Sequence, residues 1–293
     1  MEIDKIKSLN DQILAETRKR LVGFDKYINN MAMCLYADGH ILLEGNPGIA
    51  KTLAASTLAE ILGMNFGRIQ FTPDLMPSDI TGVNVFNQKS LEFEYIEGPV
   101  YNNFLLCDEI NRSPPKTQAA LLEAMQERQV SVEGVARMLP NPFIVIATQN
   151  PLEHQGTYNL PEAQIDRFLM KLLMDLPSRD VEKTMLRLKD EDLNPTVDKI
   201  VDSATIQEMQ KSIANKIEVT DQILEYIINI VHGTRENINI DIPASPRASI
   251  ALMRLGKASA AINGREYVQP DDVKKVAFHV LNHRIGLSHE AEL

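Results

Sequence analysis

The sequence predicts an α/β protein in which helices cover a parallel sheet, followed by a small all-helical domain. From about residue 40 to residue 175, short and almost continuously apolar runs alternate with amphipathic segments. This alternation is typical of strands that helices cover on both faces. After Pro177 the strand-like runs stop, and the apolar residues recur at helical spacing. The two patterns together predict a domain boundary near Pro177.

Five apolar runs are the predicted strands of the sheet. They span His40–Glu44, Gly67–Phe71, Phe104–Cys107, Phe143–Thr148 and Phe168–Met174. Helices are expected at Lys51–Leu62 and Lys116–Arg128 between strands, and at Asp25–Ala37 before the first strand. Together with an N-terminal helix, these elements make up a predicted core domain over residues 1–177.

The C-terminal part of the chain is expected to contain four helices. They span Ala204–Asn215, Thr220–His232, Pro246–Ile262 and Pro270–Asn282. Two of them begin at a proline, which is favourable because the first turn of a helix needs no N–H donor there. The charged stretch Lys189–Lys199 is the expected connector. We therefore expect a connecting segment over residues 178–200 and a helical domain over residues 201–293.

Two β-hairpins are predicted within the core domain. Val83–Phe86 and Leu91–Tyr95 flank a polar turn, and Gln129–Val132 and Val135–Met138 flank a Glu-Gly turn. Each hairpin is either a structural addition or a projecting loop that contacts a partner, and the sequence does not decide between these.

Composition excludes several classes of protein. The 293 residues are 44% hydrophobic and 24% charged, which is typical of a folded globular protein and not of a disordered chain. The formal charge of −10 argues against a general nucleic-acid or anionic-membrane binder. No run approaches the ~20 apolar residues of a membrane span, so no membrane insertion is expected. The N-terminus lacks the apolar stretch of a signal peptide, so we expect a cytoplasmic protein with Cys34 and Cys107 as buried thiols.

The most specific motif lies between the first predicted strand and the helix that follows it. Its residues are Gly45, Asn46, Pro47, Gly48, Ile49, Ala50, Lys51 and Thr52. A glycine-rich loop in this position directs backbone N–H groups at phosphate oxygens. Lys51 is then expected to reach the β- and γ-phosphates, and the Thr52 hydroxyl to bind Mg²⁺. The alternative is a simple Gly/Pro turn.

One position departs from the usual phosphate-loop pattern. Ala50 stands where a glycine is expected before the lysine. Alanine is small enough for close approach of a phosphate, but a left-handed backbone at this position is costly for it.

Two adjacent carboxylates follow the strand Phe104–Cys107. In an open α/β sheet this is the edge at which ligands bind. We expect Asp108 to hold Mg²⁺ and Glu109 to polarise the water that attacks the γ-phosphate. Neighbouring residues of a strand point to opposite faces, which suits two separate roles. The alternative is a solvated strand end.

A polar amide follows the strand Phe143–Thr148. Asn150, before Pro151, is expected to contact both the attacking water and the γ-phosphate. The alternative is a turn-forming residue before a proline.

The ordered set of motifs closely resembles MoxR-type ATPases of the AAA+ superfamily. The motifs are GNPGIAKT, FLLCDEINRSPPKTQAALLEAMQE, FIVIATQNP, NLPEAQIDRF and SPRASIALMRLGKASA. The resemblance covers roughly residues 20–285, and Ala50 looks usual for this family. It implies a Walker-type parallel-sheet AAA+ core followed by a small helical lid, and a ring of subunits, commonly a hexamer, with Mg²⁺-ATP bound between neighbours.

The resemblance also implies roles for residues outside the main motifs. Arg167 resembles the arginine finger that reaches the γ-phosphate of the next subunit, and Arg247 resembles the second sensor. Val22 and Gly23 are expected to line the adenine pocket, and Leu53 to complete the nucleotide site. The alternatives are a local ion pair for Arg167 and an ordinary first-turn residue for Arg247. Arg112 is a further candidate for the subunit interface.

The resulting expectation is an ATPase that hydrolyses Mg²⁺-ATP to ADP and phosphate and remodels or matures protein clients, as a chaperone does. The resemblance suggests a protein client, or a partner with a von Willebrand factor A domain. Two alternatives stay open: a ring that translocates nucleic acid, which the acidic charge disfavours, and a scaffold that binds ATP with little turnover, which Glu109 and Arg167 disfavour.

Overall fold

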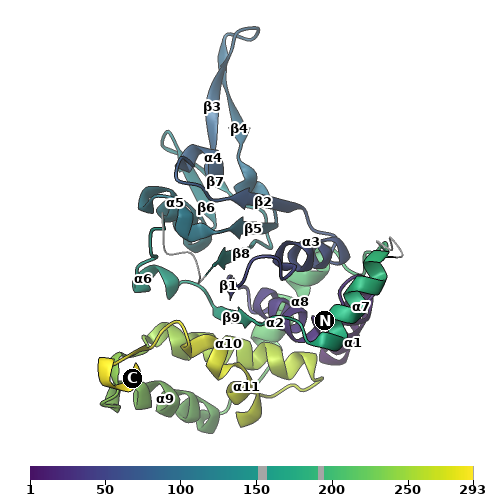
Figure 1. The fold of residues 1–293 in the computed structure, drawn as a ribbon, viewed down its shortest axis with the longest axis vertical. Helices are drawn as coiled ribbons and strands as arrows, with labels where there is room; N and C mark the ends of the chain where they lie inside the picture. The colour runs from purple at the N-terminus through teal and green to yellow at the C-terminus, as the bar shows by residue number, and fades with distance from the viewer. Residues whose placement is uncertain (151–156, 191–194, 293) are drawn as a thin grey trace.

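The central element of the protein is a sheet of five parallel strands. The computed structural model describes residues 1–150, 157–190 and 195–292. The strands are β1 (Ile41–Gly45), β2 (Phe66–Gln70), β5 (Phe104–Asp108), β8 (Ile144–Gln149) and β9 (Met170–Met174), and they lie in the order β2-β5-β8-β1-β9 (Figure 1). All five predicted strands are confirmed, with small shifts at their ends. The largest shift is in β9, which begins at Met170 and not at Phe168.

Side chains alternate between the two faces of the sheet and divide the core of this domain in two. Ile41 and Leu43 belong to one hydrophobic cluster, whereas Leu42 between them belongs to the other. The first cluster includes residues of α1 (Ile3–Thr17), α2 (Asp25–Tyr36) and α3 (Lys51–Ile61), and the second includes residues of α5 (Pro115–Glu127). These helices confirm the helices predicted from the sequence, and Figure 1 shows α3 and α5 on opposite sides of the sheet.

Both predicted hairpins are present. β3 (Gly82–Asn87) pairs with β4 (Glu92–Glu97), and β6 (Gln129–Val132) pairs with β7 (Val135–Met138). The short helix α4 (Pro77–Thr81) precedes β3, and the β3–β4 hairpin projects far from the sheet (Figure 1).

The two hairpins contact each other near the base of the longer one. The Asn84 amide donates a hydrogen bond to the Glu133 carboxylate over 2.6 Å. The Arg137 guanidinium lies 4.0 Å from the centroid of the Tyr95 ring, which is within the range of a cation–π contact. The hairpins therefore form one projecting unit.

The C-terminal part is a helical lid, as predicted. Its helices are α8 (Ser203–Lys216), α9 (Asp221–Glu236), α10 (Pro246–Ile262), α11 (Pro270–Leu281) and the short α12 (His289–Glu292). It also contains an antiparallel pair, β10 (Ile240–Ile242) with β11 (Gly286–Leu287), that the sequence analysis did not predict. These strands are too short to display an alternating pattern in the sequence.

The expected connector contains a helix. α7 (Arg179–Asp190) follows β9 directly, whereas residues 191–194 of the predicted connector lie outside the described residues. The remaining short helices are α6 (Glu162–Ile165) and two 3-10 turns, η1 (Pro99–Tyr101) and η2 (Ile110–Arg112).

Two further expectations concern burial and membranes. Cys34 and Cys107 are buried and unpaired, and burial raises the pKa of both thiols. Within the part of the chain that the structure describes, no helix has the length and apolar character needed to cross a membrane.

Candidate functional site

The carboxyl ends of three neighbouring strands bring the predicted site residues to one edge of the sheet. β8 lies between β5 and β1, and the register pairs Leu43 with Thr148 and Cys107 with Ala147. The strand ends are therefore level. The acids after β5, the amide after β8 and the loop after β1 consequently meet where an open α/β sheet binds its ligand.

The loop after β1 leaves room for an anion above the start of α3. Gly48 has φ +82°, and no atom lies within 4 Å of the position that a Cβ would take there. No side chain caps the N-terminus of α3. The N–H groups of its first turn are therefore available to oxygens of a bound anion.

Ala50 adopts the left-handed conformation, with φ +60° and ψ +27°. An L-residue in this region costs roughly 1–2 kcal/mol relative to the right-handed one. The structure thus places the strain where the sequence analysis expected a cost, inside the candidate phosphate loop. At Gly45 a side chain is excluded, because a Cβ would lie 2.6 Å from the Ile49 side chain and 2.8 Å from the Met174 carbonyl.

Lys51 begins α3, and its ammonium group faces the same edge. Nζ donates a hydrogen bond to the Gly45 carbonyl over 2.8 Å. Burial lowers the pKa of Lys51, while the carboxylates of Asp108, Glu109 and Glu44 act in the opposite direction. The lysine therefore lies close enough to the predicted catalytic acids for their charges to stabilise its ammonium form. Thr52 follows it, half-buried, and Leu53 is exposed.

Asp108 ends β5 and is almost fully buried, with 7% of its surface exposed. One carboxylate oxygen accepts a hydrogen bond from Arg68 Nε at 2.7 Å, and the other accepts one from the Thr148 hydroxyl at 3.2 Å. Thr148 in turn accepts a hydrogen bond from the Glu109 backbone N–H at 2.9 Å. The strand of the acids and the strand of the amide are thus linked directly.

Glu109 does not continue the strand. Its backbone is left-handed, with φ +58° and ψ +49°, so the expected alternation of two acids across one strand is wrong. A non-glycine residue in this region is uncommon and is held there by its surroundings. Glu109 Oε2 accepts hydrogen bonds from Gln70 at 2.7 Å and from Arg112 at 2.9 Å. Arg112 is thereby paired within its own subunit, and its place at a subunit interface stays a prediction.

Asn150 lies one residue beyond β8 and is 8% exposed. Its position beside the end of β5 agrees with the expected arrangement, whereas Pro151 lies outside the described residues. The sensing role of Asn150 stays a prediction.

Gly23, which follows Val22 in the stretch expected to line an adenine pocket, lies against α7. Gly23 has φ +79°, and a Cβ there would lie 2.7 Å from a methyl carbon of Val181. The stretch expected to line an adenine pocket therefore faces a helix that the sequence analysis assigned to a connector.

Arg167 and Arg247 line one cleft, formed by the ends of α5 and α6 and by α10. Arg167 donates to the Leu122 carbonyl at 3.2 Å, and its Nε has no partner among the described residues. A guanidinium nitrogen of Arg247 lies 3.5 Å from a carboxylate oxygen of Asp166, the residue that precedes Arg167. Arg254 and Arg284 complete the cationic lining. No residue of the loop 45–53 lines this cleft, so the structure groups Arg247 with Arg167.

Known proteins share both the sequence and the fold of this chain. The model of the ATPase family associated with various cellular activities (AAA) matches residues 40–170, and the model of the AAA lid domain matches residues 232–293. "Chaperone MoxR1" from Mycobacterium tuberculosis is 42% identical, over 96% of this chain and 76% of the relative. The chain belongs to the MoxR family of AAA+ ATPases.

Two further proteins resemble this MoxR-family chain along most of its length. The uncharacterized protein YeaC from Bacillus subtilis is 48% identical, over 88% of this chain and 81% of the relative. A crystal structure from Cytophaga hutchinsonii, solved as a candidate ATPase, matches with a TM-score of 0.92 at 44% identity. It covers 99% of this chain and 91% of that one. The α/β core and helical lid are therefore the fold expected of a MoxR-family ATPase.

Sequence reasoning missed two residues of the candidate site, Arg68 and Gln70 of β2. They contact Asp108 and Glu109, and Arg68 also donates to Gln70 at 3.1 Å. The available signal was their spacing, since two long polar side chains at alternate positions interrupt an otherwise apolar run.

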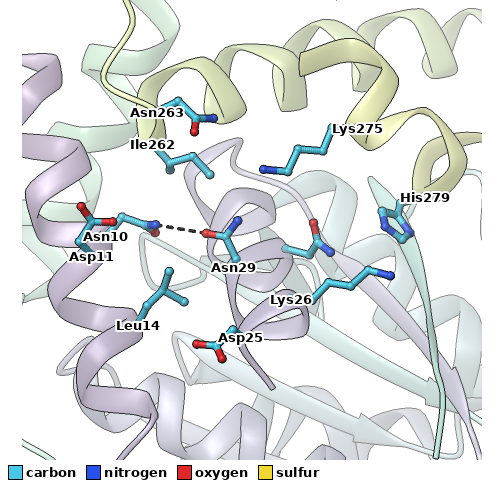
Figure 2. Close-up of a pocket in the computed structure, with 11 residues that line it drawn as sticks. Asn10, Asp11, Leu14, Asp25, Lys26, Asn29, Ile262, Asn263, Lys275 and His279 are labelled. Carbon is cyan, nitrogen blue, oxygen red and sulfur yellow. Dashed lines mark hydrogen bonds between the residues drawn. The ribbon is translucent and has the colours of Figure 1, made fainter. Parts of the chain in front are cut away.

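A separate polar pocket lies where the N-terminal helices meet the lid (Figure 2). Residues of α1, α2, α11 and the end of α10 line it, and Asn10 donates to Asn29 across it at 3.2 Å. None of the residues predicted to bind nucleotide lines this pocket. It marks the seam between core and lid in this MoxR-family subunit and is distinct from the candidate site.

Proposed function

We propose that this chain hydrolyses Mg²⁺-ATP to ADP and phosphate and uses the energy released to remodel protein clients. We propose that it does so in a ring of identical subunits, a hexamer as the family resemblance implies. The single observation that carries this proposal is the meeting of three groups at one sheet edge. They are the open loop with Lys51, the acids Asp108 and Glu109, and Asn150.

The residues at this edge fit a magnesium nucleotide. Thr52 would supply a hard oxygen ligand of the kind that Mg²⁺ prefers, and Asp108 would hold the ion through its water shell. Lys51 would supply a cation for the β- and γ-phosphates. When bound, Mg²⁺ neutralises phosphate charge. Val22 and Gly23, with α7 beside them, are proposed to hold the adenine. The hydrogen bond from Arg68 would orient the Asp108 carboxylate toward the water shell of the ion.

Catalysis needs a polarised water and a stabilised γ-phosphate more than covalent chemistry. Glu109 is proposed to accept a hydrogen bond from the attacking water, and in this structure its Oε2 accepts hydrogen bonds from Gln70 and Arg112. Asn150 is proposed to orient the same water. Arg167 is proposed to reach the γ-phosphate of the next subunit as an arginine finger. Arg247, which lines the same cleft, is proposed to act as the second sensor that couples the nucleotide to the angle of the lid.

We propose a core over residues 1–177, a connecting segment over 178–200 that contains α7, and a lid over 201–293. We also propose that the protein works in the cytoplasm.

The β3–β4 hairpin is the proposed contact with a client or with a partner that carries a von Willebrand factor A domain. Leu91 and Phe93 near its tip are 73% and 72% exposed, and Phe86 packs edge-on against Phe93. Exposed apolar groups at the end of a projecting hairpin are typical of an interaction site. A relative named as a chaperone supports a protein client.

The testing experiment is the ATPase rate per subunit, measured over a wide range of protein concentration. A shared site predicts that this rate climbs steeply and then saturates as rings assemble. Glu109→Gln is expected to bind ATP normally and to hydrolyse it very slowly, since an amide is a poor acceptor for the proton of the water. Full activity in Glu109→Gln overturns its assignment. ATP binding without turnover at any concentration favours the scaffold, and stimulation by DNA favours the nucleic-acid motor.

A further inference from the structure

The segment that carries the proposed arginine finger is held by a buried arginine of the lid. Arg284, 7% exposed, follows the end of α11 and donates to the Asp166 carboxylate at 2.7 Å. It also donates to the backbone carbonyls of Asp166, Phe168 and Leu169, at 3.1, 2.6 and 3.3 Å. A fifth hydrogen bond, to the Val280 carbonyl at 2.7 Å, anchors the guanidinium to its own helix. Every N–H of this buried cation therefore has an acceptor.

These contacts bracket Arg167 on both sides. Residues 166 to 169 form a turn between α6 and β9, in which the backbone N–H of Arg167 donates to the Gln164 carbonyl at 3.2 Å. Asn282 and His283, which precede Arg284, add hydrogen bonds to the Lys171 and Phe168 carbonyls, both at 3.2 Å. The end of the lid therefore supplies hydrogen bonds to the backbone on both sides of Arg167.

Asp166 also connects this clamp to the start of α10. Its second carboxylate oxygen accepts a hydrogen bond from Ser245 at 2.8 Å and lies 3.5 Å from Arg247. One carboxylate thus joins Arg284 to Arg247, and it belongs to the residue that precedes Arg167. A planar guanidinium with five fixed donors can hold such an arrangement, whereas an ammonium cannot.

We propose that Arg284 is a positioning residue for the proposed finger Arg167, and that it acts on the ATP site of the neighbouring subunit through Arg167 and Asp166. The inference rests on the proposed function, because it requires a site shared between subunits. Under this proposal, the lid of each subunit influences ATP hydrolysis in the neighbouring subunit. This influence is separate from any effect of the lid on the nucleotide of its own subunit.

The first test compares Arg284→Gln with Arg265→Gln. Arg265 also makes a two-pronged contact within the lid, with both oxygens of Asp272 at 2.7 Å, but it lies outside the cleft that holds Arg167. Arg284→Gln is expected to lower kcat on the order of 10- to 100-fold, the usual effect of misplacing a catalytic group by about 1 Å. ATP affinity should change little, and Arg265→Gln should keep the wild-type kcat. Unchanged kcat in Arg284→Gln overturns the proposal.

The decisive test is complementation within mixed rings. Glu109→Gln has a dead site and an intact finger, whereas Arg284→Gln has an intact site and a misplaced finger. Differently tagged copies are expressed together, and rings that carry both tags are purified. The mixed rings should exceed both parent rings in activity, because an intact site then lies beside an intact finger at some interfaces.

Each outcome has one meaning. No gain in the mixed rings, or an equal gain with Arg265→Gln in place of Arg284→Gln, overturns the positioning role. If Arg284→Gln does not fold, the same mixture with Arg284→Lys decides, since lysine keeps the charge and loses the fork of donors. Failure of the wild type itself to hydrolyse ATP removes the proposed function instead.

Discussion

Replacing Gly23 with alanine is expected to destabilise the protein and to weaken ATP binding. Gly23 lies in the stretch proposed to line the adenine pocket, and it faces α7. Its φ is +79°, and an added methyl group would lie 2.7 and 2.9 Å from the two methyl carbons of Val181. Two separate penalties therefore apply, one from the backbone and one from the contact.

The expected loss follows from adding the two penalties. The left-handed backbone costs an alanine roughly 1–2 kcal/mol. Forcing a methyl group into an occupied space costs about 1–3 kcal/mol. Gly23→Ala should therefore lower the free energy of unfolding by about 2–5 kcal/mol, and each kcal/mol lowers Tm by about 2–4 °C for a chain of this size class.

Gly134 supplies a matched control. It has almost the same backbone, with φ +80°, but no atom lies within 4 Å of the position of its Cβ. Gly134→Ala should therefore lose only the backbone term of about 1–2 kcal/mol. Adding Val181→Ala to Gly23→Ala should remove the penalty from the contact, because the two methyl groups are gone. The penalty from the backbone should remain.

The assay combines thermal unfolding with the binding of a fluorescent ATP analogue. Gly23→Ala should show the larger fall in Tm and a weaker Kd, whereas Gly134→Ala should bind the analogue like the wild type. Equal Tm values for the two alanine variants would refute the contact argument. Wild-type affinity in a folded Gly23→Ala would refute its place in the adenine pocket.

Two further predictions concern catalysis and pH. Arg167→Ala should keep its affinity for ATP and lose turnover by about 10³-fold or more, as arginine fingers do elsewhere, and wild-type turnover at saturating ATP would remove the assignment. Stability should fall between pH 7 and pH 5, because burial lowers the pKa of His40 well below 6.5 and that of His283 to about 3. The unfolded chain then binds more protons below pH 6.5, which removes roughly 2 kcal/mol per histidine at pH 5. A free energy of unfolding that is equal at both pH values would contradict this.

Local patterns predicted the strands, the loop and the acids because their signals lie within a few residues. The apolar run before Gly45 and the glycines after it fix a strand and a turn without reference to distant residues. The end of β5 at Asp108 is likewise marked locally, because a charged residue follows an apolar run directly. The edge at which these groups meet then follows from the direction of parallel strands alone.

Other parts of the site depend on pairings that no local pattern contains. Arg68 and Gln70 reach the acids only because β2 lies next to β5 in the sheet. Arg284 reaches Asp166 from the far end of the chain. The left-handed backbone of Glu109 was equally hidden, since a Glu after a strand usually has an ordinary conformation.

The helix α7 was missed for a different reason. Its signal was present, because Val181 and Met185 are spaced by one helical turn among charged residues. Charge and the nearby Pro195 made the stretch resemble a linker. Its closeness to Gly23, which is distant in the sequence, is not visible in any local pattern.

The position of Leu91, Phe86 and Phe93 has a consequence for how such proteins diversify. These side chains belong to a hairpin whose base is held by Asn84 and Tyr95. None of them belongs to either of the two buried hydrophobic clusters. Substitutions at the tip therefore leave the folding free energy nearly unchanged. Mutation can therefore change the surface of the hairpin tip while the residues at the sheet edge keep their arrangement, so the two parts of the molecule can vary independently.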